Sequence, residues 1–500
     1  MKKMKKIVRD RLDLYPDYTA EIAEIEKNGI TEELLQRIIW KHRHNAIYNR
    51  GLYERYEAIT EAVPIFDRKP RFEEEANAIN NKLNNDFFGE IIDFKTGYFA
   101  GKPIAYSYSD TEESKEDTGG EEARDTASKA LTDFVTRNNM FDVDMEVTKL
   151  ASICGYAGRL LYHDEDGNER VMPVKPFECI VLSNTDITEP EFAVRYYKTT
   201  DIHDNEVWHA EFYDSEKIRY YEGSLSALKA TGEETENLYG YCPLQGIPNN
   251  SEMLGDAEKV LSLIDGYDRA LSDNSNDIES FANAYMVFEN VNMDEKERAK
   301  GQRSGAFQYW TGGQNMGKIY FLTKDFNDAF TENHLNRLEE NIYRFSKTLN
   351  LTDESFGSLT SGVSLKFKLT GLETKCGMFQ AKMQSAGVYM FKLLAASWEK
   401  KRIEIDPLQC CMDFQRNFPL DLQSEAQAVQ ALINAGLPKR IAYAQLSFVD
   451  DVQYVLDEIE AEKEDIPSLL QPVKEDEESG NPAANKNEDS SGDNLEEWTK

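Results

Sequence analysis

The feature that most limits the possible folds is one long segment, residues 365–403, whose apolar residues recur at alternating spacings of three and four. This spacing places them on one side of an α-helix. At 1.5 Å per residue, such a helix is on the order of 50 Å long, which suits a strut in an assembly better than a globular domain. The residues that define the stripe are Leu372, Cys376, Phe379, Met383, Ala386, Met390 and Leu393.

Two other segments, residues 250–282 and 331–350, show the same spacing. Stripes of this kind predict helices that pack side by side at shallow angles. Polar Asp268 interrupts the first stripe. The apolar residues predicted to pack between these two helices are Leu261, Ile264, Leu335, Leu338, Ile342 and Phe345.

Short segments of different character connect the three helices. Residues 283–330 are typical of a small β module, with strands predicted in "AYMVFEN", "FQYW" and "KIYFLT" around the turn "TGGQNMG". Residues 351–364 contain "ESFGSLTSG", in which glycine and serine oppose regular structure. We expect a flexible loop held between two rigid helices.

The first part of the chain alternates between helical and charged segments. Helices are predicted at residues 31–62, opened by Thr31, at 81–100 and at 123–157. Residues 110–122, "DTEESKEDTGGEE", have nothing to bury and are predicted to form a surface loop.

The helix at 81–100 is apolar on most of its sides. Such a helix must be covered, and we expect the following sheet, over 158–221, and the long helix at 365–403 to cover it. Gly101 and Pro103 are expected to turn the chain from this helix into the sheet.

From residue 158 to 222 the apolar period changes to two, which predicts an antiparallel meander. "GRLLYHDEDGNERVMPV" indicates two strands about an Asp-Gly turn. Residues 223–250 are predicted to be a loose connection punctuated by glycine and proline. The sheet tyrosines could suggest base stacking, but their alternation and acidic neighbours favour ordinary cross-strand pairs.

The C-terminal part is predicted to return to helix over residues 421–465, with a Gly-Leu-Pro break at 436–438. Residues 466–500 are polar, acidic and poor in apolar side chains, so we expect disorder there.

The charge balance constrains the partners. The chain has 500 residues and a formal charge of −34, which argues against a protein that grips DNA by massive phosphate neutralisation. Several domains are expected at this length. No window approaches the roughly 20 apolar residues of a membrane-spanning helix, and the six cysteines form no CxxC pair, so a cytosolic protein with reduced thiols is expected.

Chemical motifs are weak. "GGQNMGKI" matches a phosphate-binding loop until Ile319 replaces the required Ser or Thr, and a strand-like segment follows where a helix is needed. "DEDGNE" at 164–169 lacks calcium-loop spacing. His42 and His44 point to different sides of a helix. No catalytic, cofactor-binding or metal-binding residue is therefore proposed, and the protein is not expected to be an enzyme.

Several stretches together resemble the portal proteins of tailed bacteriophages, in the family typified by a Bacillus phage with a long non-contractile tail. The resemblance spans roughly residues 40–465. The stretches that carry it are "NNDFFGEIIDFKTGYFAGKPIAY" at 84–106, "EFAVRYY" at 191–197 and "GIPNNSEMLGDAEKVLSLIDGYDRALSDNSNDIESF" at 246–281.

The resemblance implies an α+β, predominantly helical multidomain fold, assembled as a ring that is usually dodecameric. Such a ring sits at one vertex of the phage head and conducts double-stranded DNA inward and outward. In the order of the chain it implies an N-terminal arm (1–29), an α/β wing (30–245), two stem helices (250–282 and 331–350) around a clip (283–330), a channel loop (351–364), a long wing helix (365–403), a return to the wing (404–420), a crown (421–465) and an acidic tail (466–500).

The implied partners are other copies of the chain, DNA in transit, the large subunit of the packaging terminase, the major capsid and scaffolding proteins, and a head-completion or adaptor protein. No membrane is implied. The implied location is the portal vertex of the virion, and the host cytoplasm during assembly.

The loop that would touch DNA contains small and hydroxyl side chains and has no Lys or Arg from 349 to 365. An acidic conduit with weak contacts lets DNA slide, whereas tightly bound phosphates would stall it. Lys366 and Lys368 are candidates for guiding phosphate contacts, and equally for solvated charges at a helix start. The remaining loop candidates are Ser355, Phe356, Gly357, Ser358, Leu359, Thr360, Ser361 and Gly362.

Two other classes stay open at this point. A nucleotide-dependent motor would need a complete phosphate loop and an acidic partner. Another phage head structural or adaptor protein would lack a translocation channel.

Overall fold

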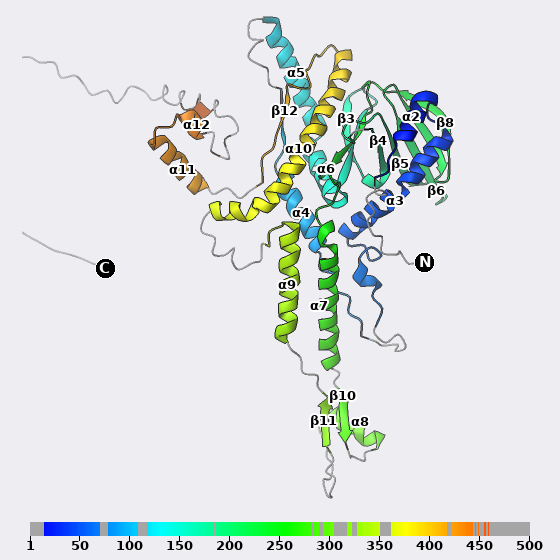
Figure 1. The fold of residues 1–500 in the computed structure, drawn as a ribbon, viewed down its shortest axis with the longest axis vertical. Helices are drawn as coiled ribbons and strands as arrows, with labels where there is room; N and C mark the ends of the chain where they lie inside the picture. Colours follow the sequence, from blue (N-terminus) through cyan, green and yellow to red (C-terminus); the bar gives the residue numbers. More distant parts are fainter. Residues whose placement is uncertain are drawn as a thin grey trace, which may run out of the picture. The chain divides into compact units, whose positions relative to one another are not determined.

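The computed structural model describes residues 15–70, 79–108, 118–184, 186–282, 285–289, 294–304, 318–322, 328–350, 362–417 and 422–443, with residues 446, 449, 455, 456 and 459. The chain divides into two units, Met1–Pro419 and Leu420–Lys500, which are described separately. Figure 1 shows the elements of both units. The fold mixes helix and sheet.

The largest sheet is antiparallel and has five strands in chain order: β4 (Cys179–Leu182), β5 (Phe192–Thr200), β6 (Glu206–Tyr213), β7 (Lys217–Ser224) and β8 (Ala227–Glu236). The meander prediction is confirmed for β5, β6 and β7. The prediction of a loose connection is wrong for β8, where only Leu228 is buried. A strand with one buried side chain shows no apolar alternation, so its sequence is typical of a loop.

Two helices cover one face of this sheet: α2 (Thr19–Asn28) and α3 (Glu32–Tyr56). The hydroxyl of Thr31 accepts a hydrogen bond from the Leu34 amide, which confirms the predicted N-cap of α3. Ile22 and Ile25 of α2 belong to the same core as the sheet. The predicted separation of residues 1–29 as an arm is therefore wrong for α2, which packs into the body.

A second sheet has three strands in the order β3 (Glu169–Val174), β2 (Tyr156–His163), β9 (Leu244–Pro248). The predicted Asp-Gly hairpin joins β2 to β3, and Asp164 accepts hydrogen bonds from the Asp166 and Asn168 amides across the turn. All five residues of β9 are buried. The loose connection predicted over 223–250 is wrong here also, because its Gly and Pro lie inside a covered strand.

The helix predicted at 81–100 is α4 (Phe87–Ala100), which begins at the N-cap Asp86. The helix predicted at 123–157 is two helices, α5 (Thr118–Arg137) and α6 (Met140–Cys154). They are separated at Asn139, whose φ is +45°. α5 starts inside the stretch predicted as a surface loop, of which residues 109–117 lie outside the described part of the chain.

The long helix α10 (Gly362–Lys400) organises the main core. Its predicted stripe is confirmed: all seven residues named above are at most 1% exposed. The Phe99 ring of α4 contacts the Phe379 ring with centroids 4.9 Å apart. The expected cover of α4 by α10 is confirmed, but α6, α3 and α7 (Leu261–Ala282) supply most of the remaining cover in place of the sheet.

Gly101 and Pro103 lead into β1 (Ala105–Tyr108), which does not join either large sheet. β1 pairs with β12 (Cys410–Asp413), so the expected turn into the main sheet is wrong. Arg416 then forms an ion pair with Glu373 of α10, and the Asn417 amide donates to the Tyr98 carbonyl of α4. Residues 410–417 are thus tied to both helices.

The two shorter helices are α7 (Leu261–Ala282), preceded by the 3₁₀ turn η4 (Glu258–Val260), and α9 (Asp328–Ser346). They lie side by side (Figure 1). Between them in the chain, β10 (Tyr285–Glu289) pairs with β11 (Lys318–Leu322), and α8 (Glu295–Ser304) is a helix that the sequence did not suggest. The "FQYW" strand and the "TGGQNMG" turn lie outside the described residues.

Short 3₁₀ turns complete the first unit: η1 (Pro64–Asp67) and η3 (Pro176–Glu178). The second unit contains α11 (Leu422–Asn434) and α12 (Lys439–Tyr443), and Gly436 between them has φ +92°. The predicted helix break at 436–438 is confirmed. The predicted disorder of residues 466–500 concerns residues outside the described part of the chain.

None of the described helices is long and apolar enough to cross a membrane. None of the six cysteines, all of which the structure describes, forms a disulfide bond, as predicted for reduced thiols, and five of them are buried.

Candidate functional site

The packing between α7 and α9 rests on a few apolar side chains. Ile264 of α7 and Ile342 of α9 are 1% and 0% exposed and belong to one core cluster with Leu52, Ile91 and Val260. Leu335 is also buried, whereas Leu261 and Leu338 are half-buried. Ile264 and Ile342, at the centre of the predicted contact between the two helices, therefore lie in one buried cluster.

Phe345 is the exception, because its side chain is 54% exposed. The prediction that it packs between the helices is wrong. A helical stripe that includes Ile342 can continue at Phe345, three residues later, or at Ser346, four residues later. Here the helix is turned so that Ser346 is buried, together with Tyr343. The Tyr343 hydroxyl donates to Glu90 of α4 at 2.8 Å, which fixes this choice of face.

A neighbouring face of α7 is held by the segment at residues 79–86, whose backbone amides donate to side chains of the helix. The amides of Asn85, Leu83 and Asn81 donate to Asp268, Ser272 and Asn276 at 2.9, 3.0 and 2.6 Å. These three acceptors lie four residues apart on one face of α7. Asp268 is 1% exposed, and burial raises the pKa of its carboxyl. Asp268 is thus part of the packing and does not interrupt it.

A buried ion cluster lies where α4, α10 and the chain before α7 meet. The Asp256 carboxylate contacts Lys95 Nζ at 2.8 Å and Lys375 Nζ at 3.0 Å. Burial alone would raise the pKa of Asp256, but the two ammonium groups outweigh it and lower this pKa to about 2. The Lys95 ammonium also lies 4.6 Å from the Phe379 ring centroid. No sequence motif indicated this cluster, because its members are far apart in the chain.

The predicted DNA-contacting residues Ser355 to Ser361 lie outside the described residues, as does the Lys366 side chain. Gly362 begins α10, so its assignment to the loop is wrong. Lys368 is exposed on the first turns of α10. The loop segment thus connects the end of α9 to the start of α10. Helix α7 carries five carboxylates and one arginine, and α9 carries four carboxylates and two arginines.

The polar residues that could suggest chemistry have structural roles. His42 is buried with Nδ1 3.0 Å from the Tyr196 hydroxyl, and burial lowers its pKa to about 4. Tyr196 and Tyr221 face the core at 4% exposure. Lys318 and Ile319 belong to strand β11, so a strand follows the glycines where a phosphate-binding loop would need a helix. Within the described residues there is no group of His, Cys, Asp and Glu side chains that could hold a metal ion.

Comparison with known proteins gives the class of this architecture. Residues 35–468 match the family described as "Phage portal protein, SPP1 Gp6-like". The portal protein of Bacillus phage SPP1 is 23% identical over 487 residues, covering 90% of this chain and 92% of its own. The portal protein of Clostridium phage phiCD119 is 22% identical over 327 residues, covering 61% and 69%.

These matches define a structural protein of a phage particle and not an enzyme family. The chain belongs to the SPP1 Gp6-like family of phage portal proteins, because the family match covers most of its length. The resemblance drawn from the sequence is thereby confirmed.

Proposed function

We propose that twelve copies of this chain form a ring at one vertex of a phage head, with a central channel through which double-stranded DNA enters and leaves. The observation that carries the proposal is the family match over residues 35–468. The paired helices α7 and α9 support it, because side-by-side rods repeated around an axis enclose a hole.

In this assembly, α7 and α9 are the stem and the β10–β11 module is the clip, where the large terminase subunit docks. Residues 30–245 form the wing, together with α10 and residues 404–420. Residues 421–465 form the crown. The remaining partners are the major capsid and scaffolding proteins and the adaptor that completes the head. Assembly takes place in the host cytoplasm, and the finished ring stays in the virion.

The proposed mechanism depends on charge and not on catalysis. The excess of carboxylates on α7 and α9 repels DNA phosphates. A duplex that passes these helices would therefore bind to them only weakly. The segment 351–364 would touch the duplex weakly through its small and hydroxyl side chains. Lys366 and Lys368 are the nearest cations for guiding contacts.

Negative-stain electron microscopy of the purified protein tests the assembly. We expect hollow rings with about a dozen subunits. A compact monomer under all conditions, or an oligomer without a central hole as for a head adaptor, would contradict the proposal.

A deletion within residues 354–362 tests the loop. We expect rings to assemble normally while the yield of packaged DNA falls, because α7 and α9 are intact and α10 loses at most Gly362, its first residue. A matched deletion in the crown, between α11 and α12, controls for general damage. Normal packaging by the loop deletion would remove the loop from the mechanism.

A further inference from the structure

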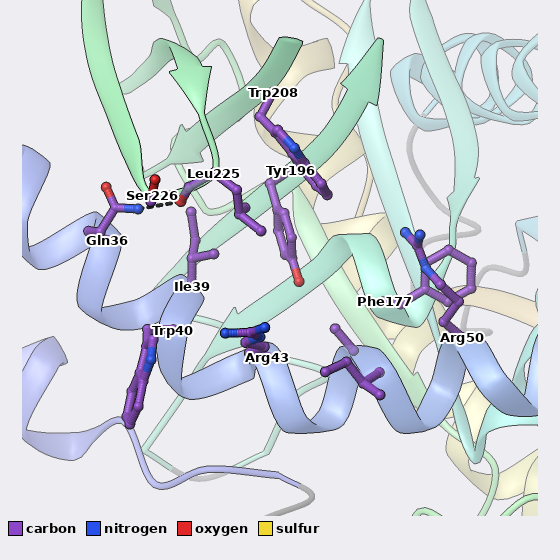
Figure 2. A pocket seen from close by; sticks show the side chains of 12 residues that line it. Gln36, Ile39, Trp40, Arg43, Arg50, Phe177, Tyr196, Trp208, Leu225 and Ser226 are labelled. Carbon is purple, nitrogen blue, oxygen red and sulfur yellow. Dashed lines mark hydrogen bonds between the residues drawn. The ribbon is translucent and has the colours of Figure 1, made fainter. Parts of the chain in front are cut away.

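A groove of about 600 Å³ lies between α3 and the uncovered part of the five-stranded sheet (Figure 2). Its sides come from α3, from η3, from β5 and β6, and from the turn between β7 and β8. The Gln36 side chain donates to the Leu225 carbonyl and closes one end. Neither the stem helices nor the loop proposed to touch DNA takes part in this groove.

The α3 side of the groove has the pattern of a helix-packing seam. Gln36, Trp40, Arg43, Ile47 and Arg50 follow one another at spacings of four and three, and all line the groove. This spacing keeps side chains on one stripe that a second helix can follow. The stripe is distinct from the face of α3 that packs on the core. From Gln36 to Arg50 it is about 21 Å long, at 1.5 Å per residue.

The apolar content of the seam is exposed. Trp40 is 72% exposed and Ile47 is 42% exposed. On the sheet side, the rings of Tyr196 and Trp208 stack at 6.0 Å, and Phe177 of η3 lies beside Arg50 (Figure 2). Helices α2 and α3 therefore leave part of the sheet face uncovered, and the space suits one further helix.

The charge of the groove indicates what kind of helix fits. Arg43 and Arg50 are exposed, and neither forms an ion pair within 4 Å in the described part of the chain. Arg37, Arg55, Arg195 and other arginines of the same body are ion-paired. Two exposed arginines that lack an ion pair within 4 Å, on an apolar groove, are complementary to an acidic partner.

We propose that this groove docks an amphipathic helix of a separate polypeptide. The helix packs along α3, buries Trp40 and Ile47 with apolar residues at spacings of three and four, and places carboxylates about seven residues apart against Arg43 and Arg50. A nucleic acid fits less well, because it brings one phosphate per nucleotide toward an acidic chain that offers two cations here.

A second copy of the chain is also a poorer occupant. Its acidic helices α7 and α9 carry exposed apolar side chains, Ile278 and Phe330, but the proposed function engages both helices in the stem of the ring. The proposal goes beyond the conduction of DNA and does not depend on it.

A displayed library of helices tests the proposal. Apolar positions are fixed at spacings of three and four, and the flanking positions are randomised between Glu, Gln and Lys. Selection on the intact protein should enrich Glu at two positions about seven residues apart. The best peptide, labelled with a fluorophore, should bind with an affinity at least tenfold weaker for the Arg43→Glu, Arg50→Glu double variant, measured by fluorescence anisotropy.

The matched control is Arg124→Glu with Lys129→Glu, which makes the same charge change at two exposed positions of α5. This control should bind the peptide as the wild type does, and circular dichroism should show that both variants are folded. Ile47→Ser, which keeps the charge, should also weaken binding because it removes apolar contact.

Several outcomes would overturn the proposal. They are enrichment of Lys or Gln in place of Glu, no enrichment above an unselected library, and equal peptide binding by the double variant and the wild type. If a labelled oligothymidylate binds more tightly than the peptide, and the double variant loses this binding, the groove would be assigned to nucleic acid. A change in subunit number of the double variant by light scattering would assign it to a second copy.

Discussion

Helices α10 and α7 share the same alternation of apolar spacings but bury it in different ways. α10 packs among apolar side chains, with Phe379, Met383 and Met390 fully buried. α7 packs Ile264 against the core on one side, while Asp268 and Ser272 on another side accept backbone hydrogen bonds from residues 83–85. The difference shows that a polar residue on a buried helix face can be a packing residue when an extended segment covers that face.

The comparison predicts the largest effect for a charge placed in the α7–α9 contact. Ile342→Asp should lower the free energy of unfolding by about 4 kcal/mol or prevent folding, because it buries an unpaired carboxylate at a 0% exposed position. Leu338→Asp should cost less, since Leu338 is half-buried. Denaturant unfolding of the purified variants measures both losses. Unchanged stability of Ile342→Asp would mean that α7 and α9 do not depend on this contact.

The ion cluster where α4, α10 and the chain before α7 meet gives the next largest effect. Asp256→Ala should destabilise by about 3 kcal/mol, because Lys95 stays buried without its carboxylate. A matched control is Glu234→Ala, which removes an exposed partner of Lys217 and should cost far less, because solvent screens an exposed ion pair. Similar losses for the two variants would contradict a buried role for the cluster.

The same cluster predicts a pH dependence with a definite sign. The pKa of Asp256 is about 2 in the folded protein, below its ordinary value of 3.8, so the folded state binds fewer protons. The contribution of Asp256 is therefore fully present above pH 3.8 and is lost as the pH falls toward 2. Unfolding of wild type and Asp256→Asn, compared between pH 3 and 7, measures this. A stability difference that grows as the pH falls from 4 to 3 would reverse the assignment.

A smaller effect should distinguish the polar side of α7 from the apolar packing of α10. Asp268→Ala should cost about 1–3 kcal/mol, because the half-buried amide of Asn85 loses its acceptor. Asp268→Asn keeps an acceptor oxygen and should retain most of the stability. Thermal unfolding of the three proteins at one protein concentration checks this order. Equal losses in both variants would indicate that charge, and not the hydrogen bond, matters.

The smallest effect is expected at the residue that the sequence misassigned. Phe345→Ser should change the free energy of unfolding by less than about 0.5 kcal/mol, because the side chain is 54% exposed. Ile342→Ser, three residues earlier, is the matched buried control. A large loss for Phe345→Ser in the assembled protein, absent in its unassembled form, would place this side chain in a contact between copies.

Particular elements show how far the sequence could predict this fold. The stripes of α10 and α9, the Thr31 cap and the β2–β3 hairpin were readable, because each depends on residues near one another in the chain. β8 and β9 were missed, since one is exposed over most of its length and the other is covered on every side. Neither kind of strand alternates between polar and apolar residues.

The sequence likewise predicted some features of the candidate site and not others. The apolar centre of the α7–α9 contact and the acidic character of both helices were visible in the sequence. The ion cluster around Asp256, the segment along α7 and the groove beside α3 were not. Each joins residues far apart in the chain, and no local pattern records which partner a side chain will meet.

By itself, the sequence determined the long helices, the family to which the chain belongs and its net charge of −34, because periodicity, local motifs and composition are properties of the chain alone. Tertiary structure alone decided that Ser346 and not Phe345 turns inward, that Asp268 is a buried acceptor, and that Arg43 and Arg50 line an open groove without an ion pair within 4 Å. These outcomes depend on the rotation of each helix against its neighbours, which is fixed only when all the contacts form together.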